Sequence, residues 1–500
     1  MGRMVRPMRT LLLALAITLA AMAATAGQPS LHDDELPPVV AAALAQAGLP
    51  HAAFAAVALP LSTRWARPWQ HRAQQPVQPG STMKLVTSVV ALDRLGPNHR
   101  GRTELLVTGT IEGDRLTGDL VLKGGADPDL DLPALWQMLW ELRRRGVREI
   151  GGRLLLDRTL FRPARIDVGL PPFDEFPEFP YNGIPDALML ADNLMGVALS
   201  SDHARMQARQ SPPLDGIEID PRLMTLTDAP CADWGDGWLP ALVEQDRDAL
   251  GTHYRIGLRG SFPRNCEAQA ELQLVDRNAV TERQVRAVWA SLGGSWPLPP
   301  GQVREDPTPS GAIAIASHQS RPWGEVLRSM NKRSDNPQAR LLFLQLGQAA
   351  MAREPNTPTL DLARREVERW FDERRIDRNG LVLENGSGLS RSERIAPQTL
   401  ALLLKAAWSG PHAPELLMSL PVAGVDGSLR QRLKGTPAEG WSRLKTGTLK
   451  DVVALAGYVR DTRGDTWAVV GVINHPQAAL GRPALDALVE WVAGSGARWR

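Results

Sequence analysis

The sequence predicts an α+β fold, in which an antiparallel sheet with helices packed on it is interrupted by a large inserted region. Apolar, strand-like runs lie near both ends of the chain, at 52–61 and 452–459. Helical spacing of apolar residues follows the first run, at 81–95, and recurs after about residue 311. Between about 101 and 296 the pattern changes to short strands and loops rich in proline and phenylalanine. A chain of 500 residues has room for about two to four domains.

The sheet is expected to combine the first two strands with the last three. Its five predicted strands are 52–61, 63–72, 441–449, 452–459 and 467–473. The predicted helices are 81–95, 323–332, 336–353, 360–375, 397–409 and 483–492. In the inserted region the predicted elements are strands at 104–110, 116–123 and 152–157 and a helix at 132–145. The apolar face of the final helix is expected to pack on the sheet.

The N-terminus resembles an export signal. Arg3, Arg6 and Arg9 precede a short apolar run at 11–21, and a small-x-small cleavage pattern ends at Ala26. A cleaved signal peptide at 1–26 and a periplasmic location are therefore predicted, with an uncleaved anchor as the alternative. No later stretch reaches the length of a membrane span. Peripheral membrane contact and oligomeric state stay open.

Composition excludes several classes of function. The formal net charge is +2, and the lysines and arginines are scattered, which argues against a nucleic-acid partner. The nine histidines show no metal-binding spacing, so neither a metal nor a cofactor is expected. The two cysteines, Cys231 and Cys266, can close a disulfide in an exported protein. The alternative is a pair of buried free thiols.

Three short motifs occur in order along the chain. Ser81-Thr82-Met83-Lys84 is an SxxK, Ser334-Asp335-Asn336 is an SxN, and Lys445-Thr446-Gly447 is a KTG. Each pattern alone is weakly specific, because Ser329-Met330-Asn331-Lys332 also fits the first. The strength of the signal lies in the order and the context. The SxxK opens a helix after a glycine loop, and the KTG lies in a strand.

The first motif supplies a nucleophile and a base. A serine hydroxyl reacts near neutral pH only beside a base. Residues i and i+3 share a helix face, so Lys84 can reach Ser81. Burial or a nearby cation such as Lys445 would lower the pKa of Lys84 and make it a base. The first backbone N–H groups of the helix suit one half of an oxyanion hole.

The other two motifs suit the two walls of a substrate groove. Lys445, Thr446 and Thr448 can hold a substrate carboxylate, and the N–H of Thr448 can complete the oxyanion hole. Gly447 is expected to let a substrate backbone approach the strand closely. Ser334 is expected to relay a proton between Lys84 and the leaving amine, and Asn336 to bond the substrate amide.

These motifs resemble those of the active-site serine penicillin-recognising superfamily. The chain is most similar to the D-Ala-D-Ala carboxypeptidase/endopeptidase family of low-molecular-mass class C penicillin-binding proteins, peptidase family S13. The resemblance spans roughly 40–495. Further stretches that carry it are Gly124-Gly125-Ala126-Asp127-Pro128, Asn385-Gly386-Ser387-Gly388-Leu389-Ser390-Arg391 and Leu444-Lys445-Thr446-Gly447-Thr448-Leu449. Arg340 departs from the family pattern, which usually has an acidic residue after the SxN, and we expect it to lie outside the chemistry.

The resemblance implies a β-lactamase/transpeptidase-like catalytic domain with two inserted, mainly β domains. The implied boundaries are 27–101 with 297–500 for the catalytic domain, 102–124 with 215–296 for the second domain and 125–214 for the third. It also implies peptidoglycan stem peptides and crosslinks as substrates and β-lactams as inhibitors. The family's roles fall on Ser81, Lys84, Ser334, Asn336, Lys445, Thr446 and Thr448.

Two other functions compete with this interpretation. A serine β-lactamase would usually carry an ExxLN segment that activates water, and none is found, so slow lactam hydrolysis is expected. A non-catalytic scaffold could bind peptidoglycan or a divisome partner through the inserted region. The intact set of three motifs argues against a pure scaffold.

Overall fold

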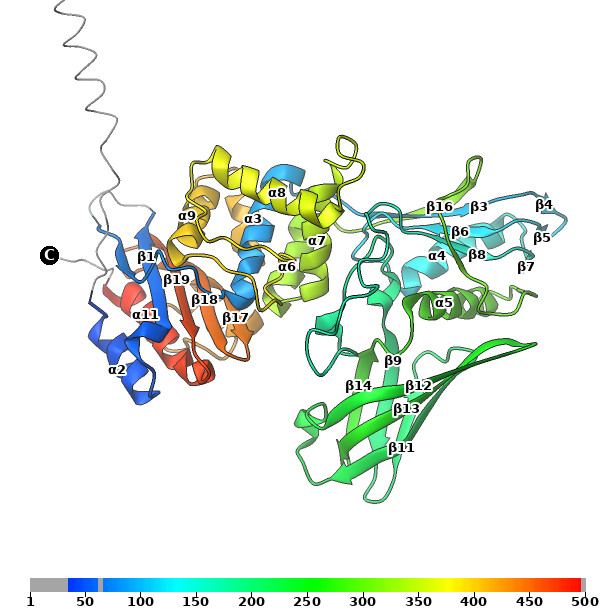
Figure 1. Ribbon diagram of the computed structural model, residues 1–500, viewed down its shortest axis with the longest axis horizontal. Coiled ribbons are helices and arrows are strands. Elements are labelled where there is room, and N and C mark those ends of the chain that lie inside the picture. The colour runs from blue at the N-terminus through cyan, green and yellow to red at the C-terminus, as the bar shows by residue number, and fades with distance from the viewer. Residues whose placement is uncertain (1–34, 62–65, 496–500) are drawn as a thin grey trace, which may run out of the picture.

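The computed structural model describes residues 35–61 and 66–495. Figure 1 shows an elongated molecule with a mixed sheet-and-helix body at one end and a separate, strand-rich insert at the other. The predicted signal peptide at 1–26 lies outside the described residues. Among the described helices, none combines the length and the apolar character that a membrane crossing requires.

One antiparallel sheet forms the centre of the main body, in the strand order β17-β18-β19-β1-β2. Its strands are β1 (Phe54–Pro60), β2 (Trp69–His71), β17 (Arg443–Leu449), β18 (Val452–Arg460) and β19 (Thr466–Asn474). The two ends of the chain therefore meet in one sheet, as predicted. β18 and β19 are covered on both faces, which explains why each forms a nearly continuous apolar run in the sequence.

Helices cover both faces of this sheet (Figure 1). One face packs α2 (Pro38–Gln46) and α11 (Arg482–Ser495) against inward residues such as Val453 and Leu455. The packing of α11 on the sheet confirms the expectation for the final helix. The other face packs a larger helical layer against residues such as Ala454 and Val470. Its helices are α3 (Lys84–Leu95), α6 (Trp323–Arg333), α7 (Asn336–Gln348), α8 (Thr359–Glu373), α9 (Pro397–Trp408) and α10 (Ala413–Ser419).

The insert leaves the main body after α3 and returns before α6. Two hydrogen bonds close its neck, where Ser320 N donates to Gly101 O at 3.0 Å and Gly101 N donates to Ser320 Oγ at 3.0 Å. The insert is therefore 102–319, and the expected return at 297 is corrected. The helical pattern was expected to resume at about 311, but β16 (Ile313–Gln319) is a strand that pairs with β3 (Arg102–Val107).

The sheets also group the insert differently from the expected second and third domains. The first group contains two sheets, β15-β8-β6-β3-β16 and β4-β5-β7, with two helices. Its elements are β3, β4 (Ile111–Glu112), β5 (Arg115–Leu116), β6 (Leu120–Lys123), α4 (Leu132–Arg144), β7 (Glu149–Ile150), β8 (Leu154–Asp157), α5 (Arg277–Ser291), β15 (Arg304–Glu305) and β16. Residues on both sides of the expected boundary at 124 belong to it, because β6 pairs with β8.

The second group lies within 195–272 and contains the sheets β10-β9-β14 and β11-β13-β12. Its strands are β9 (Met195–Ser201), β10 (Met206–Gln210), β11 (Ile217–Thr227), β12 (Trp238–Asp248), β13 (Gly251–Pro263) and β14 (Glu267–Leu272). The expected boundary at 214 falls inside it, because β9 pairs with β14. A disulfide joins Cys231 and Cys266 within this group.

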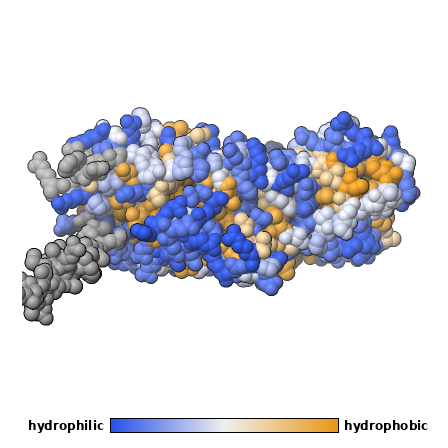
Figure 2. Space-filling view, turned by 90° about the horizontal axis from the view of Figure 1, so that it is seen from above, coloured by the Kyte–Doolittle hydropathy of each residue, from blue (hydrophilic) through white to orange (hydrophobic). Residues whose placement is uncertain are grey.

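The helices of the first group cover one face of its five-stranded sheet. Leu105, Leu122 and Leu156 point to that face and share a core with α4. The opposite face carries a small cluster of Leu106, Val121 and Leu155. Seen from above, the insert end of the molecule carries an apolar patch bordered by hydrophilic surface (Figure 2).

Candidate active site

The three motifs meet where the helical layer borders the edge strand β17. Ser81 lies in a single 3-10 turn, Gly80–Met83, which runs directly into α3. The predicted helix therefore begins three residues later than expected. Thr82 fixes the turn by donating its hydroxyl to Pro79 O at 2.8 Å. Lys84 is the first residue of α3, so turn and helix together hold the nucleophile and the base.

Lys84 is buried and has three hydrogen-bond acceptors. Its Nζ lies 3.1 Å from Ser81 Oγ, 2.6 Å from Asn336 Oδ1 and 2.5 Å from Ser387 O. Burial lowers the pKa of Lys84 to about 7. At that value a large fraction of the amine is neutral at neutral pH and can accept a proton.

Charged neighbours adjust this pKa in both directions. The carboxylates of Asp335 and Glu393 raise the pKa of Lys84, and the guanidinium of Arg340 lowers it. Arg340, which was expected to lie outside the chemistry, donates to Gly183 O of the insert at 3.2 Å and affects Lys84 through its charge. Burial also holds the pKa of Lys445 well below its usual range, and the charge of Lys84 lowers it further.

The SxN motif forms the sharp link between α6 and α7. Ser334 ends α6 in the left-handed region, at φ 61°, which is uncommon for a residue other than glycine. Asp335 then caps α7 by accepting the N–H of Gln338 at 2.8 Å. The hydroxyl of Ser334 accepts a hydrogen bond from Lys445 Nζ at 2.8 Å. The strained link thus places Ser334 beside the KTG lysine.

Both polar atoms of the Asn336 side chain form hydrogen bonds within the protein. Its Oδ1 accepts from Lys84, and its Nδ2 donates to Tyr181 O of the insert at 3.0 Å. The expected partner of this side chain was the substrate amide. In the structure, without a substrate, Asn336 joins the base to the insert.

Gly447 is also needed for a contact within the protein. A Cβ at this position would lie 2.6 Å from Pro79 O and 3.1 Å from Ser81 N. The missing side chain therefore lets the nucleophile's own turn pack on β17. Thr446, its neighbour, bonds Ser428 Oγ at 2.6 Å, a residue that the motifs did not indicate.

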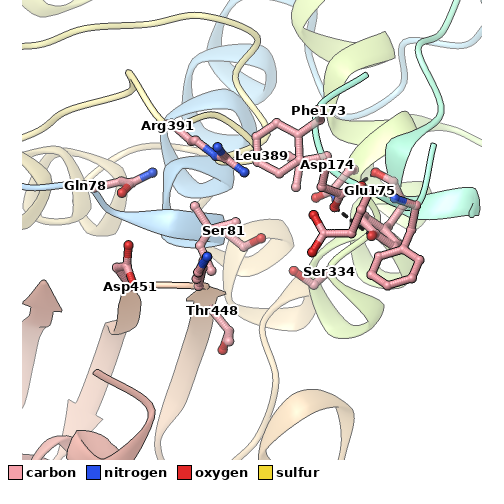
Figure 3. Close-up of a pocket in the computed structure, with 15 residues that line it drawn as sticks. Gln78, Ser81, Phe173, Asp174, Glu175, Ser334, Leu389, Arg391, Thr448 and Asp451 are labelled. Atoms are coloured by element: carbon pink, nitrogen blue, oxygen red, sulfur yellow. Dashed lines mark hydrogen bonds between the residues drawn. The ribbon is translucent and has the colours of Figure 1, made fainter. Parts of the chain in front are cut away.

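A cleft of about 760 Å³ opens over Ser81. Figure 3 shows Ser81 at its centre, with Asp174 and Glu175 on the same side as Ser334 and with Gln78 and Asp451 opposite. Arg391 and Leu389 border it from the loop before α9. The cleft thus combines both signs of charge within reach of the nucleophile.

One wall of the cleft belongs to the insert. Asp174 accepts from Tyr181 Oη at 2.7 Å and from Asn182 Nδ2 at 2.8 Å, which shapes the loop. Glu175 is exposed in the cleft. The sequence analysis noted these loops rich in proline and phenylalanine but gave them no role at the site, because they lie far along the chain from every motif.

A buried carboxylate organises the loop that carries Ser387. Glu393 is fully buried, and its two oxygens accept the backbone N–H groups of Glu384, Asn385, Gly386 and Gly388 at 3.1, 3.0, 2.9 and 2.9 Å. Burial raises the pKa of Glu393, while these backbone bonds lower it. The stretch was noticed for its resemblance, but the role of Glu393 was not predicted.

The second SxxK match is not a site. Ser329 lies inside α6 and donates its hydroxyl to Val326 O at 2.8 Å. Lys332 pairs with Asp426 instead of facing the serine. Across 35–61 and 66–495, no cluster of histidine, cysteine or acidic residues is suited to hold a metal ion.

The fold is shared with solved structures of penicillin binding protein 4 from Haemophilus influenzae. One of them matches with a TM-score of 0.72 and 24% identity, over 91% of this chain and 100% of the other. A second, described as complexed with a novel β-lactam, matches with a TM-score of 0.68 and 22% identity, over 90% and 99% of the two chains. The expected transpeptidase-like fold with added domains is thereby confirmed.

Sequence comparison gives the family. A D-alanyl-D-alanine carboxypeptidase of Actinomadura sp. (strain R39) is 31% identical over 77% of this chain and 71% of its own. The D-alanyl-D-alanine carboxypeptidase DacB of Haemophilus influenzae is 28% identical over 79% and 80%. The model of the D-Ala-D-Ala carboxypeptidase 3 (S13) family matches residues 38–494. The chain belongs to this family, as the motifs predicted.

Proposed function

We propose that the protein is a serine-type D-Ala-D-Ala carboxypeptidase, a DD-endopeptidase, or both, acting on peptidoglycan through an acyl-enzyme on Ser81. The observation that carries the proposal is the pairing of Ser81 Oγ with the buried Lys84 Nζ at 3.1 Å. A buried amine with a lowered pKa is the base that a serine nucleophile needs. The family and the relatives named for D-alanyl-D-alanine carboxypeptidase support the substrate class.

In the proposed acylation, neutral Lys84 takes the proton of Ser81, and Oγ attacks the carbonyl carbon of the penultimate D-alanine. The N–H groups of Ser81 and Thr448 receive the developing oxyanion. The C–N bond then breaks, and Ser334 passes to the leaving amine the proton that Lys84 took, so Lys84 is neutral again for the attack of water. Lys445 Nζ, 2.8 Å from Ser334 Oγ, holds Ser334 in place. Water later hydrolyses the ester and frees the enzyme.

The cleft supports a stem peptide as substrate. Thr446 and Thr448 offer two hydroxyls from β17 to the terminal carboxylate, and binding of that anion would favour the protonated form of Lys445 on the same strand. The acidic wall from the insert, with the exposed Glu175, suits an amine on the peptide's diamino acid. A β-lactam resembles the acyl-D-Ala-D-Ala end and would be trapped as an ester on Ser81. The predicted signal at 1–26 would deliver the enzyme to the periplasm, where these substrates lie.

Intact-mass spectrometry after incubation with benzylpenicillin tests this proposal. We expect one covalent adduct, mapped to the peptide that contains Ser81, and no adduct on Ser81→Ala. Ser329→Ala is the matched control, because it removes the serine of the second SxxK match and should be acylated like the wild type. A folded wild-type protein without adduct would contradict acyl transfer and favour the scaffold. Rapid turnover of penicillin would instead indicate a β-lactamase.

A further inference from the structure

A second cleft, of about 730 Å³, lies in the main body beside the active site. It is bounded by α6, by α10 and by the facing ends of β17 and β18. Its lining combines aromatic surface with positive charge. Trp441 is 60% exposed there, and the guanidinium of Arg460 stacks over its ring at 4.2 Å.

The charge of this cleft is unbalanced. Its cationic lining residues are Arg328, Lys332, Arg443 and Arg460, and its one acidic lining residue is Asp426. Asp426 is already paired with Lys332. The charge of Arg328 also acts on Asp426, so the lining carries four cations against one carboxylate. Among the described residues, neither Arg443 nor Arg460 forms a salt bridge. Such a site favours an anionic ligand.

The cleft adjoins the side of the active site where the leaving group departs. Arg443 and Lys445 are two residues apart on β17, so their side chains share one face of the strand. Lys332 lies two residues before Ser334 at the end of α6. Thr446 donates to the hydroxyl of Ser428 at 2.6 Å, two residues after Asp426, which lines the second cleft. A group leaving past Ser334 and Thr446 therefore moves toward the arginines.

The edge of β17 would also guide a longer leaving group toward the second cleft. β17 is the last strand of its sheet, so its free edge can pair with a substrate backbone. The start of that edge is already occupied, because Val422 pairs with Arg443 and Leu444 N donates to Pro421 O at 2.9 Å. A peptide continuing beyond Lys445 must leave the edge there and pass over the segment that borders the second cleft.

We propose that this cleft binds the leaving strand of a peptidoglycan crosslink through that strand's free carboxylates. The inference rests on the acyl transfer proposed for Ser81 and names the substrate class it serves. In crosslink cleavage the bond broken joins the acyl carbonyl to an amine of the second stem peptide, and that amine takes the proton. The second peptide carries carboxylates beyond the amine. A leaving D-alanine ends at its own carboxylate and does not reach the arginines.

The test compares the full-length wild-type protein with the double variant Arg328→Ala/Arg460→Ala. The two arginines are exposed and lie in α6 and at the end of β18. The measured quantity is kcat/KM on a peptide dimer joined by a D-alanyl crosslink with free carboxylates on the leaving strand. Because exposed ion pairs contribute little binding free energy, we expect kcat/KM for this dimer to fall roughly three- to tenfold. The same dimer with those carboxylates amidated, and D-alanine release from a pentapeptide, should be unaffected by the substitutions.

A second pair of substitutions, Arg353→Ala/Lys405→Ala, removes the same charge from exposed sites that do not line this cleft and should leave all three reactions unchanged. Benzylpenicillin acylation of Ser81 in each variant shows that the fold and the chemistry are intact. An equal loss on all substrates, or no loss on the dimer, would overturn the proposal. Absence of the penicillin adduct in the wild type would instead remove the proposed function itself.

Discussion

Whether Ser81 can react depends on the protonation of Lys84, which burial and three neighbouring charges set together. Burial lowers the pKa of Lys84 to about 7, and the positive charge of Arg340 acts in the same direction. Asp335 and Glu393 oppose it. Acylation requires the neutral amine, so its rate should rise with pH through about 7 and then level off.

Substituting Arg340 should shift this profile. In Arg340→Gln a positive charge is lost, the pKa of Lys84 rises, and the rising limb of the acylation rate moves to higher pH. At about pH 6.5 benzylpenicillin acylation should be roughly two- to fivefold slower, while the plateau at high pH should be unchanged. Rates of benzylpenicillin acylation measured over a range of pH give both the rate at about pH 6.5 and the plateau rate. Arg340→Lys keeps the charge and should give the wild-type profile; an unshifted profile in Arg340→Gln would contradict the role of the charge.

At the scale of single elements, the loop before α9 depends on one carboxylate. Glu393 accepts four backbone N–H groups, and the loop that it shapes brings Ser387 O to 2.5 Å from Lys84 Nζ. A glycine in this loop is also required by the contact, because a Cβ on Gly388 would lie 2.0 Å from Gly80 O. The loop therefore supports both the base and the nucleophile's turn.

Glu393→Ala should weaken both the fold and the chemistry. Each buried N–H left without an acceptor costs about 1–3 kcal/mol, and entering water can satisfy some of them. We expect the free energy of unfolding to fall by roughly 3 kcal/mol or more and acylation to slow. Denaturant unfolding and adduct formation measure the two effects. Glu393→Gln keeps one acceptor oxygen, so its free energy of unfolding should lie between those of Glu393→Ala and the wild type. A Glu393→Ala protein as stable as the wild type would contradict this role of Glu393.

Helices and strands could be predicted from the sequence where one face or both faces of the element are buried. The amphipathic α8 and the doubly covered β18 and β19 produce clear sequence patterns, and their predicted positions hold. β16 and β11 were missed, because both carry exposed and half-buried residues in irregular order. The motif residues were predictable because their spacing is local. Asn336's bond to Tyr181 was not, since it joins residues that are distant in the sequence.

At the scale of the whole molecule, the active-site cleft is shared between the main body and the insert. The chain departs at Gly101 and returns at Ser320, yet the loop around Asp174 reaches back to the cleft over Ser81. No local pattern encodes such an approach, so the composition of this wall could only come from the folded chain. Because the wall is acidic, its charge should affect peptide substrates and not the chemistry at Ser81.

Glu175→Gln tests this division of roles. Glu175 is exposed in the cleft and bears a charge that a peptide with a free side-chain amine would meet, whereas benzylpenicillin has no such amine. We expect kcat/KM for that peptide to fall roughly three- to tenfold, as for an exposed ion pair, and penicillin acylation to be unchanged. Glu112→Gln, an exposed acid in β4 that does not line the cleft, is the matched control. A peptide whose amine is acetylated should be insensitive to Glu175→Gln. An equal loss on that peptide would show that the wall acts by shape rather than by charge.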